Sequence, residues 1–247
     1  MRGWNLAFAL ILWAYLLLVA PWLARRSHRL LVQSLAAGDA NGRIRQYTST
    51  AGRNVAIAAV AVALVVTADG GQLEYLGLRS PTNAASLSAT LAVALLAVMV
   101  TRLVQVRRSG RITMVSGDKV RPYQPVTTLE RAVYGVTLLV NSVTRQLVFA
   151  GFLGVTVVSV WPEASAWSAI GVAAIVAAVN QSWLSRSAIP MGALGGALSM
   201  YLFLATESIL LGVAYFVVAG AQGFIAPVTN VTSKAGPGRL DEPATPA

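Results

Sequence analysis

The sequence predicts an all-α fold, a polytopic bundle of about seven transmembrane helices, on three observations. Of 247 residues, 56% are hydrophobic and only 11% are charged, and the mean hydropathy is +0.65. Soluble domains devote about a quarter of their residues to charge. The apolar residues form blocks close to the ~18 residues that cross ~30 Å of hydrocarbon. Arginines gather between the blocks. This excludes a water-soluble enzyme, a disordered protein and, since cysteine is absent, a disulfide scaffold.

The predicted spans cover about residues 4–24, 54–68, 87–106, 131–160, 165–184, 188–206 and 208–226. Arg25 and Arg26 follow the first span, which indicates a retained anchor rather than a cleaved signal peptide. The second span is short, and we expect it to borrow residues from one flank. The fourth makes ~45 Å of helix, so it must tilt, bend near Gly151 and Gly154, or project into the cytoplasm.

Residues 1–226 therefore form a single predicted transmembrane domain. The remaining residues, 227–247, are rich in Pro, Gly, Ser and Thr, and we expect them to form a disordered cytoplasmic tail.

Charge alternates along the predicted loops. The chain has 19 Lys and Arg against 9 Asp and Glu, a net charge of +10. The loops after the first, third and fifth spans and the tail are basic, whereas the other loops carry acids. Because Lys and Arg are retained in the cytoplasm, the pattern predicts a plasma-membrane protein with its N-terminus outside and its C-terminus inside. An eighth crossing is the alternative, and it would reverse one end. The lipid bilayer is the expected partner; nucleic acid is not, since no basic patch is interleaved with aromatic residues.

A search for catalytic constellations finds none. His28 is the single histidine, in a predicted basic loop where we expect it to be solvated, whereas a helical zinc site needs two. No predicted span holds a His or Lys to activate a serine. The aspartates that an aspartyl protease would need all lie outside the spans: Asp39, Asp69, Asp118 and Asp241. The sequence therefore predicts no catalytic residue, no metal site and no cofactor.

Polar side chains within the spans mark a candidate pocket. A charge there costs ~2.5–3.5 kcal/mol on insertion scales, so Arg145, deep in the fourth span, is the first candidate. The predicted pocket residues are Asn141, Arg145, Gln146, Asn180, Gln181 and Glu207. We expect the amides or Glu207 to hold Arg145. The alternative is that these groups join helices, at about 0.6–2 kcal/mol per hydrogen bond. By the same packing logic, Gly192, Gly195 and Gly196 are expected to let helices approach closely.

The segment 143–153, which reads V-T-R-Q-L-V-F-A-G-F-L, resembles the first motif of the CPBP family. These are the CAAX-processing and bacteriocin-processing intramembrane endopeptidases, also called Abi proteins. The motif reads E-E-x-x-F-R-G-F-L, often with a Glu-Arg pair some fifteen residues upstream, as at Glu130-Arg131 here. Residues 76–81, L-G-L-R-S-P, are similar to the family's leader. The resemblance covers about residues 73–223.

The catalytic positions of that family carry other residues in this chain. The paired glutamates align with Arg145 and Gln146, and the motif arginine aligns with Ala150. Asn180 or Gln181 stands where the second motif has histidine, and the third motif falls near Phe216 and Gly220. An arginine stays protonated and cannot serve as a general base.

The resemblance therefore implies a non-catalytic relative whose former active-site cavity binds a peptide, a lipidated segment or a partner protein. The alternative is an active endopeptidase for CAAX or leader peptides with Glu207 as base, although one carboxylate lacks the pair that acid–base catalysis needs. A permease component unrelated to proteases is a third alternative, without a positive signal in the sequence.

Overall fold

The computed structural model describes residues 3–68, 73–83, 85, 88, 92, 122–161, 163, 165–184, 186 and 188–225. Over these residues all the regular secondary structure is helical. The elements are α1 (Gly3–Ala14), η1 (Tyr15–Val19), α2 (Ala20–Ala36), α3 (Gly42–Ala68), η2 (Leu73–Leu76), α5 (Thr128–Gln146), η4 (Leu147–Phe152), α6 (Leu153–Val160), α7 (Ala166–Gln181), α8 (Ala188–Thr206) and α9 (Leu210–Ile225). The all-α prediction is confirmed for this part of the chain.

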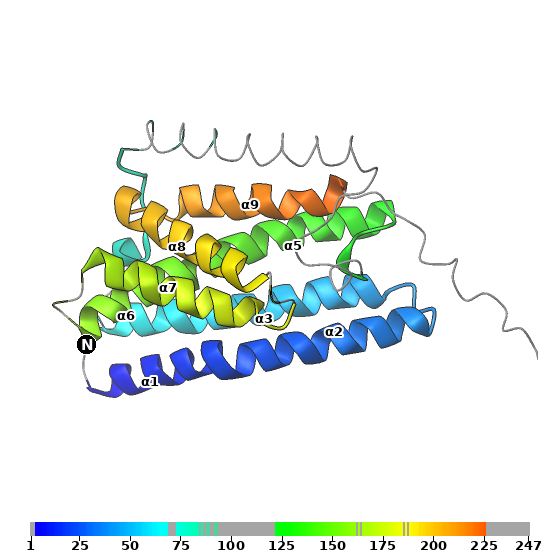
Figure 1. The fold of residues 1–247 in the computed structure, drawn as a ribbon, viewed down its shortest axis with the longest axis horizontal. Coiled ribbons are helices and arrows are strands. Elements are labelled where there is room, and N and C mark those ends of the chain that lie inside the picture. Colours follow the sequence, from blue (N-terminus) through cyan, green and yellow to red (C-terminus); the bar gives the residue numbers. More distant parts are fainter. Residues whose placement is uncertain are drawn as a thin grey trace, which may run out of the picture.

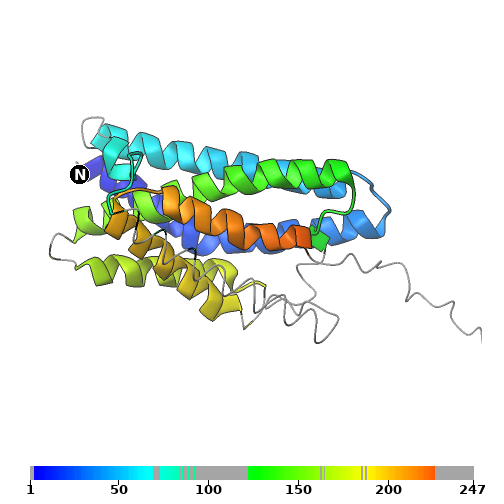
Figure 2. The same cartoon turned by 90° about the horizontal axis from the view of Figure 1, so that it is seen from above.

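The helices lie roughly along one direction in a bundle (Figure 1). The α1–η1–α2 run borders one side and α5 with α9 the other (Figure 1). Figure 2 shows α3 and α5 side by side, with α7 and α8 across the bundle from them. The most extensive helix contacts are α7 with α8, α3 with α5, and α5 with α9. Gly192 and Gly196 allow the first of these pairs, because a Cβ on Gly196 would lie 2.5 Å from the Ala173 carbonyl oxygen.

Membrane character follows from helix length and from what the helices expose. Four helical runs in the described chain are long and apolar enough to cross a bilayer: Ala7–Ala36, Gly42–Thr67, Thr128–Val160 and Ala188–Thr206. Two apolar helices, Ala166–Gln181 and Leu210–Ala221, are shorter. Large apolar side chains such as Leu18, Val136 and Trp167 are exposed on the bundle surface, where hydrocarbon rather than water would stabilise them. The predicted third span, 87–106, and the tail, 227–247, lie outside the described residues apart from positions 88 and 92.

The predicted basic loop after the first span is wrong in its extent. Arg25, Arg26, His28 and Arg29 belong to α2, which continues to Ala36, and α3 begins at Gly42. The second predicted span therefore does borrow residues, all from its N-terminal flank. A short turn remains, in which Ser34 Oγ donates to Asp39 Oδ2 at 2.7 Å. A prediction based on hydropathy assigns arginine-rich segments to loops. Arginine is nevertheless a good helix former, and its side chain can extend to the edge of a membrane, so the helix continues through it.

The long fourth block is one continuous helical run with an irregularity inside it. Thr127 caps α5, since Glu130 N–H donates to Thr127 Oγ1 at 3.1 Å and Thr127 N–H donates to Glu130 Oε2 at 3.0 Å. The π-helical segment η4 then separates α5 from α6 and contains Gly151. Such widened turns commonly lie at functional sites. The sequence offered a bend near Gly151 and Gly154 as one of three alternatives, and the structure has a π-helical segment that contains Gly151.

Contacts between connecting segments define two ends of the bundle. At the first end, which we call the α2–α3 end, Arg43 Nε donates to Pro122 O at 3.0 Å and Tyr47 Oη donates to Tyr123 O at 2.7 Å. At the second, the α8–α9 end, Ile209 N–H donates to Gly77 O at 3.1 Å and Thr82 N–H donates to Thr206 O at 2.9 Å. The chain thus brings sequence-distant connections together at each end.

Candidate functional site

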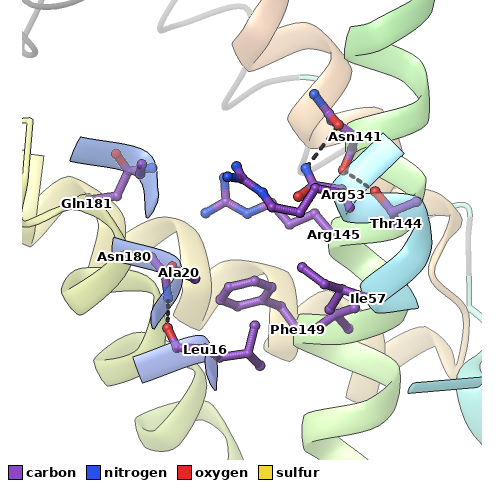
Figure 3. A pocket seen from close by; sticks show the side chains of 13 residues that line it. Leu16, Ala20, Arg53, Ile57, Asn141, Thr144, Arg145, Phe149, Asn180 and Gln181 are labelled. Carbon is purple, nitrogen blue, oxygen red and sulfur yellow. Dashed lines mark hydrogen bonds between the residues drawn. The ribbon is translucent and has the colours of Figure 1, made fainter. Parts of the chain in front are cut away.

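A cavity of about 280 Å³ lies among η1, α2, α3, α5, η4 and α7 (Figure 3). Its apolar wall comes mainly from the first helical run and from η4, and its polar wall from α3, α5 and α7. The lining residues are Leu16, Ala20, Ala24, Arg53, Asn54, Ile57, Asn141, Thr144, Arg145, Val148, Phe149, Asn180 and Gln181. Four of the six predicted pocket residues, Asn141, Arg145, Asn180 and Gln181, therefore line one cavity.

Arg145 is held by aromatic rings. Its guanidinium carbon lies 4.3 Å from the ring centre of Phe216 on α9 and 5.3 Å from that of Phe149 on η4. Among the described residues, its buried Nε has no hydrogen-bond partner. Cation–π contacts use the face of the guanidinium and leave its in-plane N–H groups able to donate to another molecule. We expected the amides or Glu207 to hold Arg145, but its described contacts are with Phe149 and Phe216.

A second arginine, Arg53 on α3, lines the same cavity. The ion pairs among the described residues are Arg43–Glu130, Arg45–Asp39 and Arg79–Glu207, so neither cavity arginine belongs to one of them. Burial raises the pKa of the nearby Tyr123 phenol to about 12, and the positive charge of Arg53 opposes that rise. No Asp or Glu lines the cavity among the described residues.

The cavity amides mostly join helices. Asn54 Nδ2 on α3 donates to Asn141 Oδ1 on α5 at 3.0 Å (Figure 3). Asn180 Nδ2 on α7 donates to the Leu16 carbonyl oxygen at 3.0 Å. Pro21 stands five residues after Leu16, the spacing of the π-helical bonds in η1, and has no N–H to give. Asn180 therefore supplies the hydrogen bond that the helix itself cannot.

Gln146 lies away from the cavity, in the contact of α5 with α8 and α9. Its Nε2 donates to Ser199 Oγ at 2.8 Å, and Ser199 Oγ donates back to Gln146 Oε1 at 3.1 Å. Gly212 on α9 has no side chain at the point where the Gln146 amide lies, and a Cβ there would collide with it. Gln146 thus joins helices, which is the alternative that the sequence left open.

Glu207 also lies elsewhere, at the α8–α9 end. It forms an ion pair with Arg79, whose Nε also donates to the Glu207 carbonyl oxygen at 3.0 Å. Its backbone has φ +54°, in the left-handed region that residues other than glycine seldom adopt. The position suits a turn between α8 and α9 and is remote from the lining of the cavity.

His28 is not in a loop, as the sequence suggested, but on α2. Its ring centre lies 5.7 Å from that of Tyr123 and 5.6 Å from that of Trp183. Within the part of the chain that the structure covers, no three His, Cys, Asp or Glu side chains are grouped as a metal site would require.

Two residues of the cavity lining, Arg53 and Asn54, were not among the predicted pocket residues, and Phe216 was named only as lying near the third family motif. Because Arg53 was assigned to the basic loop, its position within α3 was not predicted. One signal could have identified it: Arg53, Asn54 and Ile57 have the spacing of one helical face once α3 is extended to Gly42.

Comparison with known proteins gives no relative: no family model, no curated protein and no solved structure matches the chain.

Proposed function

We propose that this protein is a non-catalytic membrane protein, related to the CPBP endopeptidases, that binds a ligand in the cavity between α2, α3, α5 and α7. The observation that carries the proposal is a cavity of about 280 Å³ lined by two arginines outside any ion pair of the described residues. A charge retained within a membrane helix despite its insertion cost points to function.

The positions aligned with the three family motifs support the relationship. Arg145 aligns with the first motif, Asn180 or Gln181 with the second, and Phe216 falls near the third. Arg145 and both amides line the cavity, and Phe216 lies against the Arg145 guanidinium. A shared cavity at these positions is what descent from such an active site would leave behind. The ligand class that the resemblance suggests is a peptide, a lipidated segment or a partner protein.

We further propose seven spans, with the α2–α3 end in the cytoplasm. Residues 73–83 belong to the α8–α9 end and residues 122–127 to the α2–α3 end, as a crossing between them would require. Trp183, after α7, lies near His28 and Tyr123, and this contact supports the proposal that the connection after α7 belongs to the same end. Since the chain has no cysteine, single cysteines at Asp39 and Glu207 report sidedness directly. Labelling of both from the same side of intact cells would contradict this topology.

Mass spectrometry of the protein purified in mild detergent tests ligand binding. Ala24 lines the cavity, so Ala24→Trp should fill it, whereas Leu18→Trp places the same bulk on an exposed site of the same helical run. We expect a molecule of fixed mass to stay with the wild type and Leu18→Trp and to be lost from Ala24→Trp. Retention by all three proteins, or by none, would overturn the proposal.

A cleavage assay with prenylated and leader peptides tests the enzyme alternative. We expect no turnover, because Glu207 is paired with Arg79 outside the cavity. Turnover that Glu207→Gln abolishes would replace the binding proposal with the endopeptidase.

A further inference from the structure

The charges of the cavity indicate what kind of ligand it takes. Arg53 and Arg145 bring two full positive charges to one lining that holds no Asp or Glu among the described residues. The C-terminal carbonyls of α7 at Gln181 carry about half a negative charge, too little to balance two guanidinium groups. A charge buried in a low-dielectric bundle is costly unless it is paired. The positive charge of the cavity lining is therefore not balanced by the described residues.

The donors are arranged to meet an oxyanion. The guanidinium carbon of Arg145 lies over the rings of Phe216 and Phe149, and no hydrogen bond from this guanidinium is formed among the described residues. The Arg145 side chain extends from α5 into the cavity, toward the side where α7 places Gln181 (Figure 3). Planar guanidinium groups bind phosphate and carboxylate oxygens through paired N–H donors. Inorganic phosphate or a phosphate monoester carries about −1.5 to −2 charges at pH 7 and balances two arginines better than a single carboxylate does. A phospholipid phosphodiester carries one charge and offers two non-bridging oxygens to the paired donors.

The lining also has an apolar part. Its members include Leu16 and Ala20 from the first helical run and Val148 and Phe149 from η4. A ligand that combines a phosphate with a hydrocarbon part would satisfy both walls, and a membrane phospholipid has this chemistry. An inorganic or soluble organic phosphate would satisfy only the polar wall.

We propose that the cavity binds a phosphate group through Arg53 and Arg145, with a phospholipid headgroup and free phosphate as its two sources. This inference rests on the proposed ligand-binding function and specifies the chemistry of the ligand.

Two binding arms distinguish the sources. The delipidated protein is titrated calorimetrically with inorganic phosphate, and it is reconstituted in phosphatidylcholine nanodiscs with or without phosphatidylglycerol, in which retained lipid is counted by native mass spectrometry. We expect Arg145→Leu and Arg53→Gln each to weaken binding at least 10-fold in whichever arm the wild type binds. Arg131→Leu, which removes an exposed arginine from the same helix as Arg145, should leave binding within 2-fold.

Arg145→Lys serves as the control for folding, because it keeps the positive charge but loses the planar pair of N–H donors. We expect it to elute as the wild type does and to bind more weakly. Wild type that binds in neither arm, or Arg145→Leu that binds as the wild type does, would overturn the inference. If the molecule retained by the wild type and lost from Ala24→Trp carries no phosphate, the proposed function stands and this inference fails.

Discussion

The contact of α3 with α5 contains arginines in opposite surroundings. At the α2–α3 end, Arg43 Nη1 lies 3.3 Å from Glu130 Oε1, and the Glu130 side chain is only 3% exposed. Further along the same two helices, Arg53 and Arg145 line a cavity in which no described carboxylate faces them. Arg43 is thus paired within the chain, whereas Arg53 and Arg145 belong to no ion pair among the described residues. Under the proposed function, the difference separates a charge that serves folding from two that serve binding.

The largest expected effect is at the compensated site. Glu130 accepts hydrogen bonds from the Val126 and Thr127 N–H groups at 2.6 and 3.0 Å, in addition to pairing with Arg43. Glu130→Ala removes the ion-pair partner of Arg43 and the acceptor of two N–H groups, whereas Arg43 keeps its hydrogen bond to Pro122 O. Because the Arg43 side chain is 20% exposed, we expect a loss of about 3 kcal/mol of unfolding free energy, the lower end for a buried pair. Unfolding in detergent, followed by tryptophan fluorescence, measures it. Glu163→Ala, at an exposed glutamate, is the control, and an equal loss in both variants would refute the assignment.

An intermediate effect is expected between α5 and α8, where polar groups are buried but uncharged. Ser199→Ala leaves the Gln146 amide without the partner that lies 2.8 Å away, and we expect a loss of about 0.6–2 kcal/mol. A double-mutant cycle with Gln146→Leu isolates the pair. Additive losses in the cycle would mean that the two side chains do not stabilise one another.

The smallest effect is expected at the exposed turn between α2 and α3. A hydrogen bond from Ser34, the Asn41 N–H and the charge of Arg45 hold the pKa of Asp39 below its ordinary value, although desolvation opposes them. Because the pKa is lower in the folded state, the stabilisation is present at neutral pH and is lost as the pH falls through that lowered value. The melting temperature of Ser34→Ala should therefore differ slightly from the wild type at pH 7 and converge with it at about pH 2. If the difference in melting temperature between the wild type and Ser34→Ala instead grew as the pH fell, the assignment would be wrong.

Much of the fold could be predicted from hydropathy alone, because helices in lipid must satisfy their own backbone hydrogen bonds. The apolar runs that become α7, α8 and α9 were located within a few residues at both ends. Helix ends outside the apolar region could not be located in this way. Arg25 through Ala36 and Gly42 through Arg53 continue their helices with polar side chains, and hydropathy does not distinguish such a continuation from a loop.

The cavity was predictable in part. Arg145 and three amides were identified because polar groups are rare within spans. Gln146 was predicted to line the pocket because it follows Arg145 in the sequence. Consecutive residues of a helix are rotated by roughly 100°, so Gln146 faces α8 while Arg145 faces the cavity. Phe216 was named only through the family resemblance, since an aromatic residue in an apolar helix is ordinary and its contact with Arg145 depends on how α9 packs against α5.

The contrast between the two kinds of arginine is tested most directly by measuring the thermal unfolding of Arg43→Leu and Arg145→Leu in ligand-free detergent. Replacing an uncompensated buried charge with an apolar residue removes the desolvation cost of the charge and is expected to be neutral or stabilising, whereas removing one partner of a buried pair is destabilising. The account predicts that Arg145→Leu unfolds at or above the wild-type temperature and that Arg43→Leu unfolds well below it. A melting temperature for Arg145→Leu as low as that of Arg43→Leu would show that Arg145 is needed for folding and would contradict the account.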